Sequence, residues 1–237
     1  MDPIFFTPVV VIIVGVVFTI IMNNRHKAAK ADSSVDQERG NYSSYKTELL
    51  AQDFSRLKDW MKGKPIDAFT SASIPQSTAN KVQNLVTDGL KNVALSAIGM
   101  KLRRVETDAF LVLSGTDLHF LTTDKDGDLE EHLIFDNSRI SRAYLQDGGV
   151  YKPHLGFYGK QAEEYLPKVH LIVFDIDGQE IALEIHDRLK FMPDASAVWN
   201  MKKQVQTRTK YQVVGELFLT ELRSRFSNLK NISNRIS

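Results

Sequence analysis

The spacing of hydrophobic residues along this chain of 237 residues changes near Lys101. Before that point, apolar residues recur every three or four positions, which is typical of one face of an α-helix. After it they alternate with polar residues, which is typical of a half-buried β-strand. The helical spacing returns near the end of the chain. The pattern therefore predicts an α+β protein in which helices come first, strands follow, and a helix closes the chain.

Amphipathic helices are predicted on both sides of the strands. The first covers residues 45–61 and ends at Gly63-Lys64-Pro65, because glycine and proline stop a helix. Residues 69–77, FTSASIPQS, are predicted to be a break, after which Ser77 caps a helix over residues 77–98. The closing helix is predicted over residues 195–227. Its apolar face consists of Val214, Leu217, Phe218, Leu222 and Phe226.

Seven strands are predicted between these helices, at residues 101–107, 109–115, 117–123, 129–136, 139–146, 168–176 and 179–185. Asp126-Gly127 and Asp177-Gly178 are predicted to be hairpin turns, because a two-residue type I′ turn needs positive φ at both positions. These turns fix the pairing of the strands beside them. His119 should lie opposite Ile134, His132 opposite Leu121, and His170 opposite Ile185.

The predicted pairing limits what the histidines can do. His119 and His132 become diagonal neighbours on one face, whereas His170 and His186 point to opposite faces of their hairpin. Four of the six histidines therefore cannot form one cluster, and two alone are a poor ligand set for a metal. No metal site and no cofactor are predicted.

Residues 4–22, IFFTPVVVIIVGVVFTIIM, form an uncharged apolar stretch. Nineteen helical residues at about 1.5 Å each reach roughly 28 Å, close to the ~30 Å hydrocarbon core of a bilayer. A cleaved signal peptide is the alternative, because residues 29–31 have the small-x-small form, but Asp2 stands where such a peptide has basic residues. The stretch therefore predicts a transmembrane helix that binds the lipid bilayer.

Basic residues follow the apolar stretch, at Arg25, Lys27 and Lys30. The positive-inside rule then predicts a single-pass protein of the cell membrane, with its N-terminus outside and its body in the cytoplasm. The same three residues, together with Lys202 and Lys203 near the start of the closing helix, are candidates for contact with an anionic lipid surface.

Four segments result from this division of the chain. Residues 1–24 are the predicted anchor, and residues 25–44 are a polar, flexible linker. Residues 45–99 hold the first two amphipathic helices, and residues 100–237 hold the β domain with its closing helix.

The sequence VFDIDG, which contains Asp175 and Asp177, is similar to the start of an aspartate-based phosphatase site. Such phosphatases require threonine after the glycine, a later acidic pair for Mg²⁺, and a parallel sheet built from βαβ units. Gln179 replaces the threonine, and the strand pattern resumes at once. A calcium loop at Asp124-Lys125-Asp126-Gly127-Asp128 is also disfavoured, because the glycine is at position 4 rather than 6.

Charge and composition exclude several classes of function. The net charge of +1 gives no general attraction to nucleic acid, and the absence of cysteine excludes disulfides and thiolate chemistry. The charges are nevertheless unevenly placed. Residues 106–136 contain nine acids and one lysine, whereas residues 202–235 contain eight basic residues and two acids. These two regions either face each other, are solvated, or steer a partner such as a second copy of the chain.

The segment AFLVLSGTDLHFLTTDKDGDLEEHLIFDNSRISRAYL resembles the bacterial pleckstrin-homology-like domains. Its hydrophobic strand, turn, Leu-x-Phe strand, charged hairpin and final strand follow the pattern of that family. The resemblance covers roughly residues 100–227. It implies a strongly bent, seven-stranded antiparallel sheet or partial barrel, with one open end closed by a C-terminal helix. The basic signature of phosphoinositide-binding relatives is not reproduced.

The long loop over residues 147–167 mixes aromatic with basic side chains, as protein interfaces do. The candidate partner-binding residues are Tyr151, Lys152, His154, Phe157 and Tyr158. We therefore expect a non-enzymatic, membrane-anchored adaptor or assembly subunit that binds a protein partner or its own copies. Sensing of anionic lipid by the basic closing helix is the alternative function, and an aspartate-based phosphatase is the least favoured.

Overall fold

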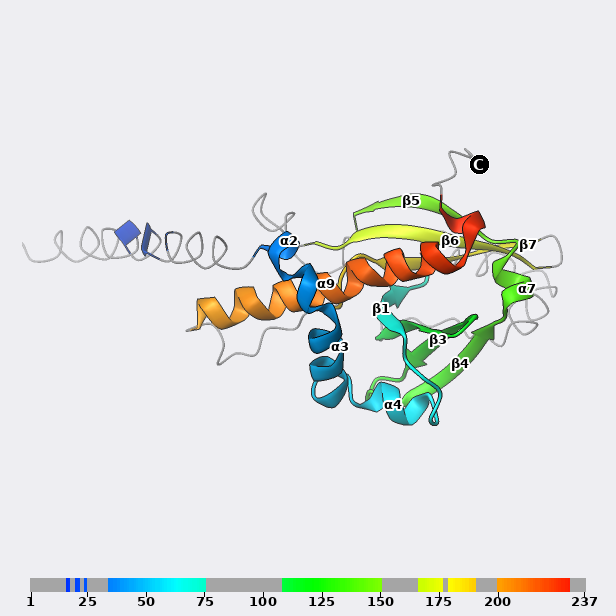
Figure 1. The fold of residues 1–237 in the computed structure, drawn as a ribbon, viewed down its shortest axis with the longest axis horizontal. Helices are drawn as coiled ribbons and strands as arrows, with labels where there is room; N and C mark the ends of the chain where they lie inside the picture. The colour runs from blue at the N-terminus through cyan, green and yellow to red at the C-terminus, as the bar shows by residue number, and fades with distance from the viewer. Residues whose placement is uncertain are drawn as a thin grey trace, which may run out of the picture.

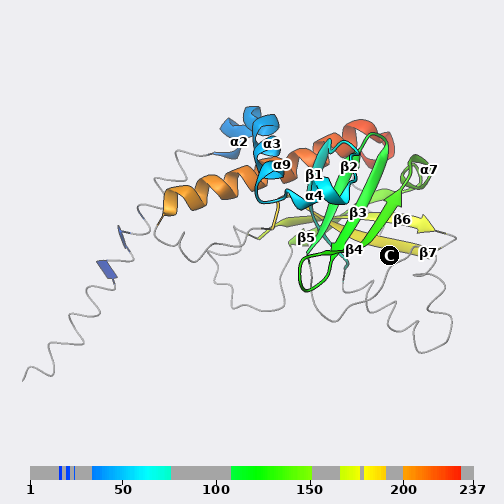
Figure 2. The ribbon, with the colours of Figure 1, turned by 90° about the horizontal axis from the view of Figure 1, so that it is seen from below.

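The structure is a computed structural model that describes residues 34–75, 108–150, 166–176, 179–190 and 200–230, together with residues 16, 17, 20, 21 and 24. Short helices come first, a seven-stranded sheet follows, and a long helix, α9, closes the described chain. In both Figure 1 and Figure 2, α9 runs alongside the sheet and continues past it on the side of α2. The α+β class predicted from the sequence is confirmed.

The first predicted helix is present but interrupted. The helical elements here are α2 (Val35–Glu38), η2 (Arg39–Asn41), α3 (Tyr42–Ala51) and α4 (Arg56–Trp60). Between α3 and α4, Gln52 has non-helical dihedrals of −121° and −93°. The end at Gly63 is as predicted, because Lys62 and Gly63 both have positive φ, at 50° and 83°. The helix predicted over residues 77–98 lies outside the described residues.

The seven strands form one antiparallel sheet in the order β4-β3-β2-β1-β7-β6-β5. Their bounds are β1 (Ala68–Ser73), β2 (Ala109–Ser114), β3 (Asp117–Thr123), β4 (Leu129–Phe135), β5 (Tyr144–Val150), β6 (Lys168–Ile176) and β7 (Gln179–His186). The predicted pairings are confirmed: His119 lies opposite Ile134, Leu121 opposite His132, and His170 opposite Ile185.

Two of the predicted elements differ from the observed ones. Residues 68–73 form the central strand β1, so the break predicted over residues 69–77 is wrong for its first half. The start of the strand predicted at 139–146 is instead a short helix, α7 (Asn137–Ile140), which Asp136 caps by accepting a hydrogen bond from the Arg139 N–H. The strand predicted at 101–107 lies outside the described part of the chain.

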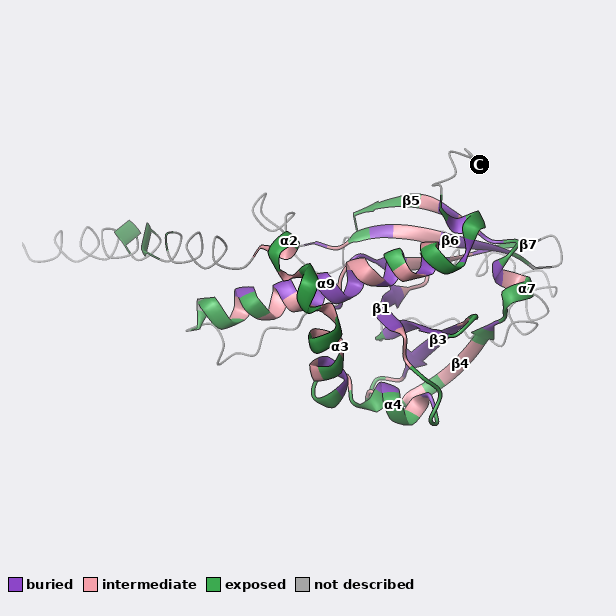
Figure 3. Ribbon diagram, in the orientation of Figure 1, coloured by how far each residue is buried: buried purple, intermediate pink, exposed green. Residues whose placement is uncertain are grey.

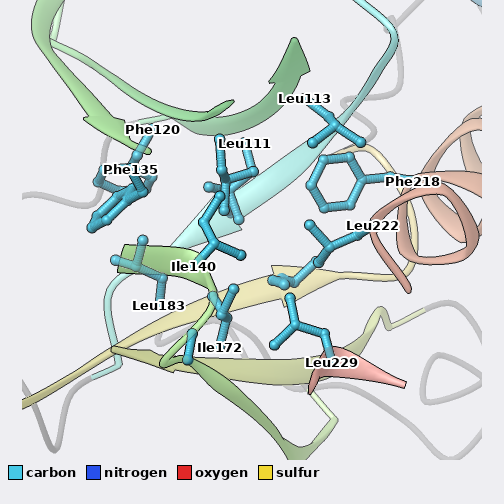
Figure 4. Close-up of a cluster of buried hydrophobic side chains, with 14 of the residues drawn as sticks. Leu111, Leu113, Phe120, Phe135, Ile140, Ile172, Leu183, Phe218, Leu222 and Leu229 are labelled. Atoms are coloured by element: carbon cyan, nitrogen blue, oxygen red, sulfur yellow. The ribbon is translucent and has the colours of Figure 1, made fainter. Parts of the chain in front are cut away.

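One face of the sheet encloses the main hydrophobic core. The core contains residues from both halves of the sheet, including Leu111, Phe120 and Phe135 from β2 to β4, and Ile172 and Leu183 from β6 and β7. Side chains from strands so far apart in the order β4-β3-β2-β1-β7-β6-β5 can share one core only if the sheet bends over it. We call this face the inner face. Figure 4 shows these side chains converging, and Figure 3 shows buried residues along the central strands.

The outer face of β1 to β3 is covered by α3 and α4. Leu49 and Leu50 of α3, with Leu57 and Met61 at α4, form a second cluster with outward-facing side chains of the strands. The strand residues in this cluster are Phe69, Phe110, Val112 and Leu121. The helices at residues 42–61 therefore pack directly on the sheet and belong to the same folded body as the strands.

The closing helix α9 (Met201–Arg225) contacts both clusters. Tyr211 and Val214, in its first half, pack with α3 and α4. Phe218, Leu222 and Phe226, farther along, enter the core on the inner face. The predicted apolar stripe thus serves two cores, because α9 runs from one cluster to the other.

A charged contact ties the end of α9 to the sheet. Arg225 donates to Asp67 Oδ2 at 2.7 Å and to the Gly115 carbonyl at 2.6 Å, and the Gly115 N–H donates to the same carboxylate at 2.8 Å. Burial alone would raise the pKa of Asp67, but the hydrogen bonds from Arg225 and Gly115 outweigh it and lower that pKa.

The prediction of a transmembrane helix, and with it that of a single-pass cell-membrane protein, is corrected by the structure. Among the residues that it describes, no helix is both long and apolar enough to cross a bilayer. A span needs about 20 mainly apolar helical residues. The one described helix of that length, α9, carries Lys202, Lys203 and Lys210 and cannot serve. Of residues 4–22, only 16, 17, 20 and 21 are described.

Candidate functional site

The partner-binding candidates proposed from the sequence begin directly after β5. Tyr151, Lys152, His154, Phe157 and Tyr158 all lie outside the described residues. The strand that leads to them is described as far as Val150. What the structure contributes to this candidate site is therefore the end of β5.

The end of β5 is the most open part of the sheet. Residues 147–150 are all exposed, and Val150 keeps 45% of its surface accessible. A bulge near Gly149, which has φ of 77°, shifts the pairing with β6. Gly148 lies so close to β6 that an added Cβ would be 2.9 Å from Val169 Cγ1. Since β5 is the last strand in the sheet order, its other edge has no strand neighbour within the described sheet.

The lipid-surface candidates separate into two groups. Arg25, Lys27 and Lys30 lie outside the described residues, whereas Lys202 and Lys203 are exposed in the first turn of α9. Asn200 caps this helix by accepting a hydrogen bond from the Lys203 N–H at 3.1 Å. No acid lies in the first turn. Lysines are unfavourable there, because the positive end of the helix dipole repels them.

Both Asp-Gly sequences connect paired antiparallel strands, as predicted. Asp126-Gly127 is not the predicted two-residue type I′ turn, however, because Gly127 but not Asp126 has positive φ and a register shift pairs Thr123 with Leu129. Asp175 pairs with Glu180 across β6 and β7, and Ile176 pairs with Gln179, so residues 177 and 178 connect an antiparallel pair. A phosphatase aspartate would instead follow a parallel strand. In the other hairpin, Asp124 Oδ1 accepts the N–H groups of Asp126 and Asp128, each at 2.9 Å, which stabilises the turn.

The two charged regions form ion pairs with other elements. In the acidic region, Asp108 pairs with Lys190 at 2.9 Å and Asp128 with Arg56 at 3.4 Å. In the basic region, Lys210 pairs with Glu48 at 2.7 Å and Arg225 with Asp67. None of these four ion pairs therefore joins an acid of the acidic region to a basic residue of the basic region. Charged side chains are exposed in the acidic hairpin of β3 and β4 and in the first turn of α9.

A polar group that sequence reasoning missed joins β1 to β7 on the outer face. Ser73 Oγ lies 2.8 Å from His186 Nε2, and it also donates to Glu184 Oε2. His186 is 4% exposed, and burial lowers its pKa to about 4, so the imidazole is neutral at pH 7. A serine, an imidazole and a carboxylate are the groups used in nucleophilic catalysis.

The direction of the hydrogen bonds gives this group a structural role. Because the Ser73 hydroxyl donates to Glu184, its oxygen accepts from His186, whose Nε2 must carry the proton. In a catalytic triad the histidine instead receives the serine proton. The group therefore acts as a clamp between strands. The alternating hydroxyls of Ser71 and Ser73 in FTSAS are the sequence signal that could have indicated it.

The histidine pair predicted from the strand register is present. Nδ1 of His119 and Nε2 of His132 are 2.7 Å apart, and the ring centroids are 5.0 Å apart. His119 is fully buried, and its Nε2 has no hydrogen-bond partner. Burial, followed by the nearby His132 and Lys64, lowers the pKa of His119 to about 4. Burial and Lys64 likewise lower the pKa of His132.

A recess of about 310 Å³ lies where the first helices meet α9, and it is lined by Glu38, Tyr45, Gln206, Thr209 and Lys210. Its charged groups are used in packing. Lys210 Nζ donates to both oxygens of Glu48, at 2.7 and 2.8 Å, and Glu38 accepts hydrogen bonds from Tyr45 and Asn41. The recess is therefore part of the contact that holds α3 on α9.

Comparison of this chain with known protein families, with curated proteins and with solved structures finds no match. Its function must therefore be inferred from the residues and contacts described above.

Proposed function

We propose that this protein is a non-enzymatic assembly subunit that binds further copies of itself through the exposed end of β5. The observation that carries the proposal is the run of exposed residues 147–150 on the last strand of the sheet. An edge strand presents N–H and C=O groups that another strand can bind, although the Gly149 N–H already donates to Asp147 Oδ1 at 3.0 Å. Val150, 45% exposed, adds apolar surface at the same place.

The charge distribution supports a second copy as the partner. The chain carries an acidic hairpin and a basic helix but has a net charge of only +1. Surfaces of opposite sign on one chain are complementary between two copies, and they steer encounter and fix orientation. A partner of a single charge sign would be attracted by one of these surfaces and repelled by the other.

The fold supports an interaction role of the kind that the resemblance to bacterial pleckstrin-homology-like domains implies. A bent sheet of seven antiparallel strands and a C-terminal helix that enters its core are the arrangement expected from that resemblance. In such an arrangement the strands and the helix supply the stability. The ends of the sheet are then available for partners.

Replacing Val150 with aspartate is expected to weaken self-association by about tenfold, because it removes exposed apolar area and adds charge at the contact. Sedimentation velocity over a range of concentrations measures this effect. Ile134→Asp is the matched control, since Ile134 is 40% exposed on β4, the edge strand at the other end of the sheet. The control leaves β5 unchanged and adds its charge to the acidic hairpin, so it should associate at least as tightly as the wild type.

The proposal fails if the wild type remains a monomer at all concentrations, or if both variants associate equally well. Salt dependence provides an independent check. Screening of the opposed charges should weaken the association as ionic strength rises. Strengthening at high salt would contradict the role of the charged surfaces.

A further inference from the structure

The turn after α4 carries two lysines that lie beside β4 on the outer face of the sheet. Met61 packs in the same cluster as Leu121, and Leu121 lies opposite His132 of β4. The residues that follow Met61 therefore leave the helix next to His132. They include Lys62 and Lys64, both of which are exposed.

Lys62 has an unusual backbone conformation. Its φ is 50°, and within the described ranges it is the one residue other than glycine with positive φ. Glycine or asparagine adopts this left-handed conformation with less strain than lysine does. Strained residues are concentrated at functional sites. The presence of a lysine here therefore points to a use for its charge.

The two lysines take no part in holding the fold together. Among the described residues, no ion pair or side-chain hydrogen bond involves Lys62 or Lys64. After burial, the charges that lower the pKa of His132 are those of Lys64 and Lys62. Asp117 acts on the buried partner, His119, and has the smallest effect there. The electrostatic field at His132 is therefore positive and favours an anion.

His132 supplies a hydrogen-bond donor to the same place. Nδ1 of His119 lies 2.7 Å from Nε2 of His132, and Nε2 of His119 is buried without a partner. A buried N–H without a partner is rarer than a buried acceptor without one, so the proton of His119 is placed on Nδ1, which donates to His132. The neutral ring of His132 then carries its own proton on Nδ1. His132 is only partly buried, so this N–H can reach a ligand.

An apolar surface adjoins these groups. Ile134 is two residues farther along β4, on the same face as His132, and is 40% exposed. Two residues of a strand span about 7 Å, which is close to the size of an aromatic ring. A ligand that has an anionic group beside His132 can therefore place an apolar group against Ile134.

We infer that Lys62, Lys64 and His132 bind the phosphate group of a small, soluble phosphate monoester, whose organic part lies against Ile134. A phosphate monoester carries about −1.5 to −2 charges at pH 7 and three acceptor oxygens, which match two ammonium groups and one imidazole N–H. Lysine binds phosphate as a point charge, whereas recognition of a carboxylate more often uses the paired N–H groups of arginine. The inference is independent of the proposed self-association.

Titration of the full chain with phenyl phosphate, followed by ¹H–¹⁵N nuclear magnetic resonance, tests this site. The amide signals of residues 62–64 and 132–134 should shift and then saturate. Lys64→Gln should weaken binding by about fivefold or more, because it removes one attractive charge. Lys203→Gln is the matched control, since Lys203 is an exposed lysine on α9, and it should bind like the wild type.

Two further variants separate the parts of the site. Lys62→Gly should also bind phenyl phosphate more weakly, yet it should be at least as stable in urea as the wild type, because glycine relieves the positive φ. Ile134→Ala should bind inorganic phosphate like the wild type but should lose the tighter binding of phenyl phosphate.

Three results would overturn the inference. Equal affinities of Lys64→Gln and Lys203→Gln, or shifts that do not saturate, would show only a general attraction to anions. Acetate binding as tight as that of phosphate would exclude selectivity for phosphate. Binding to vesicles that contain phosphatidic acid, without binding to phenyl phosphate, would exclude a soluble ligand.

Discussion

Replacing Gly215 with alanine is expected to destabilise the fold by about 3 kcal/mol or more, although alanine is the better helix former. In the middle of a helix, alanine is ordinarily more stable than glycine by about 1 kcal/mol. At this position an added Cβ would lie 2.4 Å from Arg188 Cα and 2.6 Å from Arg188 N. Both contacts are with main-chain atoms, so a change of side-chain rotamer cannot relieve them.

The main chain around Arg188, which would have to move, is held by hydrogen bonds of its neighbouring residues. The Leu189 N–H donates to the Tyr211 carbonyl of α9 at 3.2 Å, and Asp187 Oδ1 accepts the Lys168 N–H at 3.0 Å. Displacing the main chain at Arg188 would therefore weaken the contacts of this segment with both α9 and β6. This is why the loss should exceed the gain in helix propensity.

Urea unfolding of the Gly215→Ala protein measures the loss. Gly40→Ala is the matched control, because an added Cβ at Gly40 meets no atom within 4 Å. The control should be neutral or slightly more stable than the wild type. Equal midpoints for the two variants would mean that α9 is not held tightly against residues 187–189.

Truncating Phe218 to alanine is expected to cost about 3–5 kcal/mol, the usual range for a buried phenylalanine. Phe218 is fully buried and projects from α9 into the inner core, as Figure 4 shows. The side chain lies between the helix and both halves of the bent sheet. The surrounding strands are tied by their own pairings, so the cavity can collapse only in part.

The unfolding midpoint in urea again provides the measurement, with two controls. Thr220→Ala changes an exposed residue two positions along the same helix and should shift the stability by less than about 0.5 kcal/mol. Phe218→Leu keeps most of the apolar volume and should lose much less than the alanine variant. A Phe218→Ala protein as stable as Thr220→Ala would show that α9 does not close the core.

Local patterns in the sequence predicted the hairpins well. Asp126-Gly127 and Asp177-Gly178 fixed the register of two strand pairs, and with it the contact between His119 and His132. The period of two along a strand makes such pairing arithmetic reliable once the turn is known. The apolar stripe of the closing helix was equally visible, since Phe218, Leu222 and Phe226 enter the core.

Features that depend on residues far apart in the chain could not be predicted from local sequence patterns. The polar sequence of β1 is typical of a turn, yet its hydroxyls find partners on and after β7: Thr70 donates to the His186 carbonyl at 2.8 Å, and Ser71 accepts the Lys190 N–H at 2.8 Å. A membrane anchor was inferred from hydropathy alone, and no described helix supports it. For the site, the sequence indicated the His119 and His132 pair but not the clamp formed by Ser73, Glu184 and His186.

The central position of β1 has a consequence for the order of folding. β1 pairs with β7 at only two positions, Ala72 with Ile185 and Ser73 with Glu184, and the residues joined there are more than 110 positions apart in the chain. The hairpins β3–β4 and β6–β7 close over short turns. The junction of β1 and β7 closes a very long loop, so its loop-closure entropy is lost before its contacts can stabilise the fold. We therefore expect the two halves of the sheet to form early and the junction to form late.

Pulse-labelled hydrogen exchange should protect amides in both hairpins before the amides of β7 that pair with β1, and simultaneous protection would contradict this order. The hydrogen bonds among Ser73, Glu184 and His186 would then form in the last step of folding, when the two preformed halves of the sheet join.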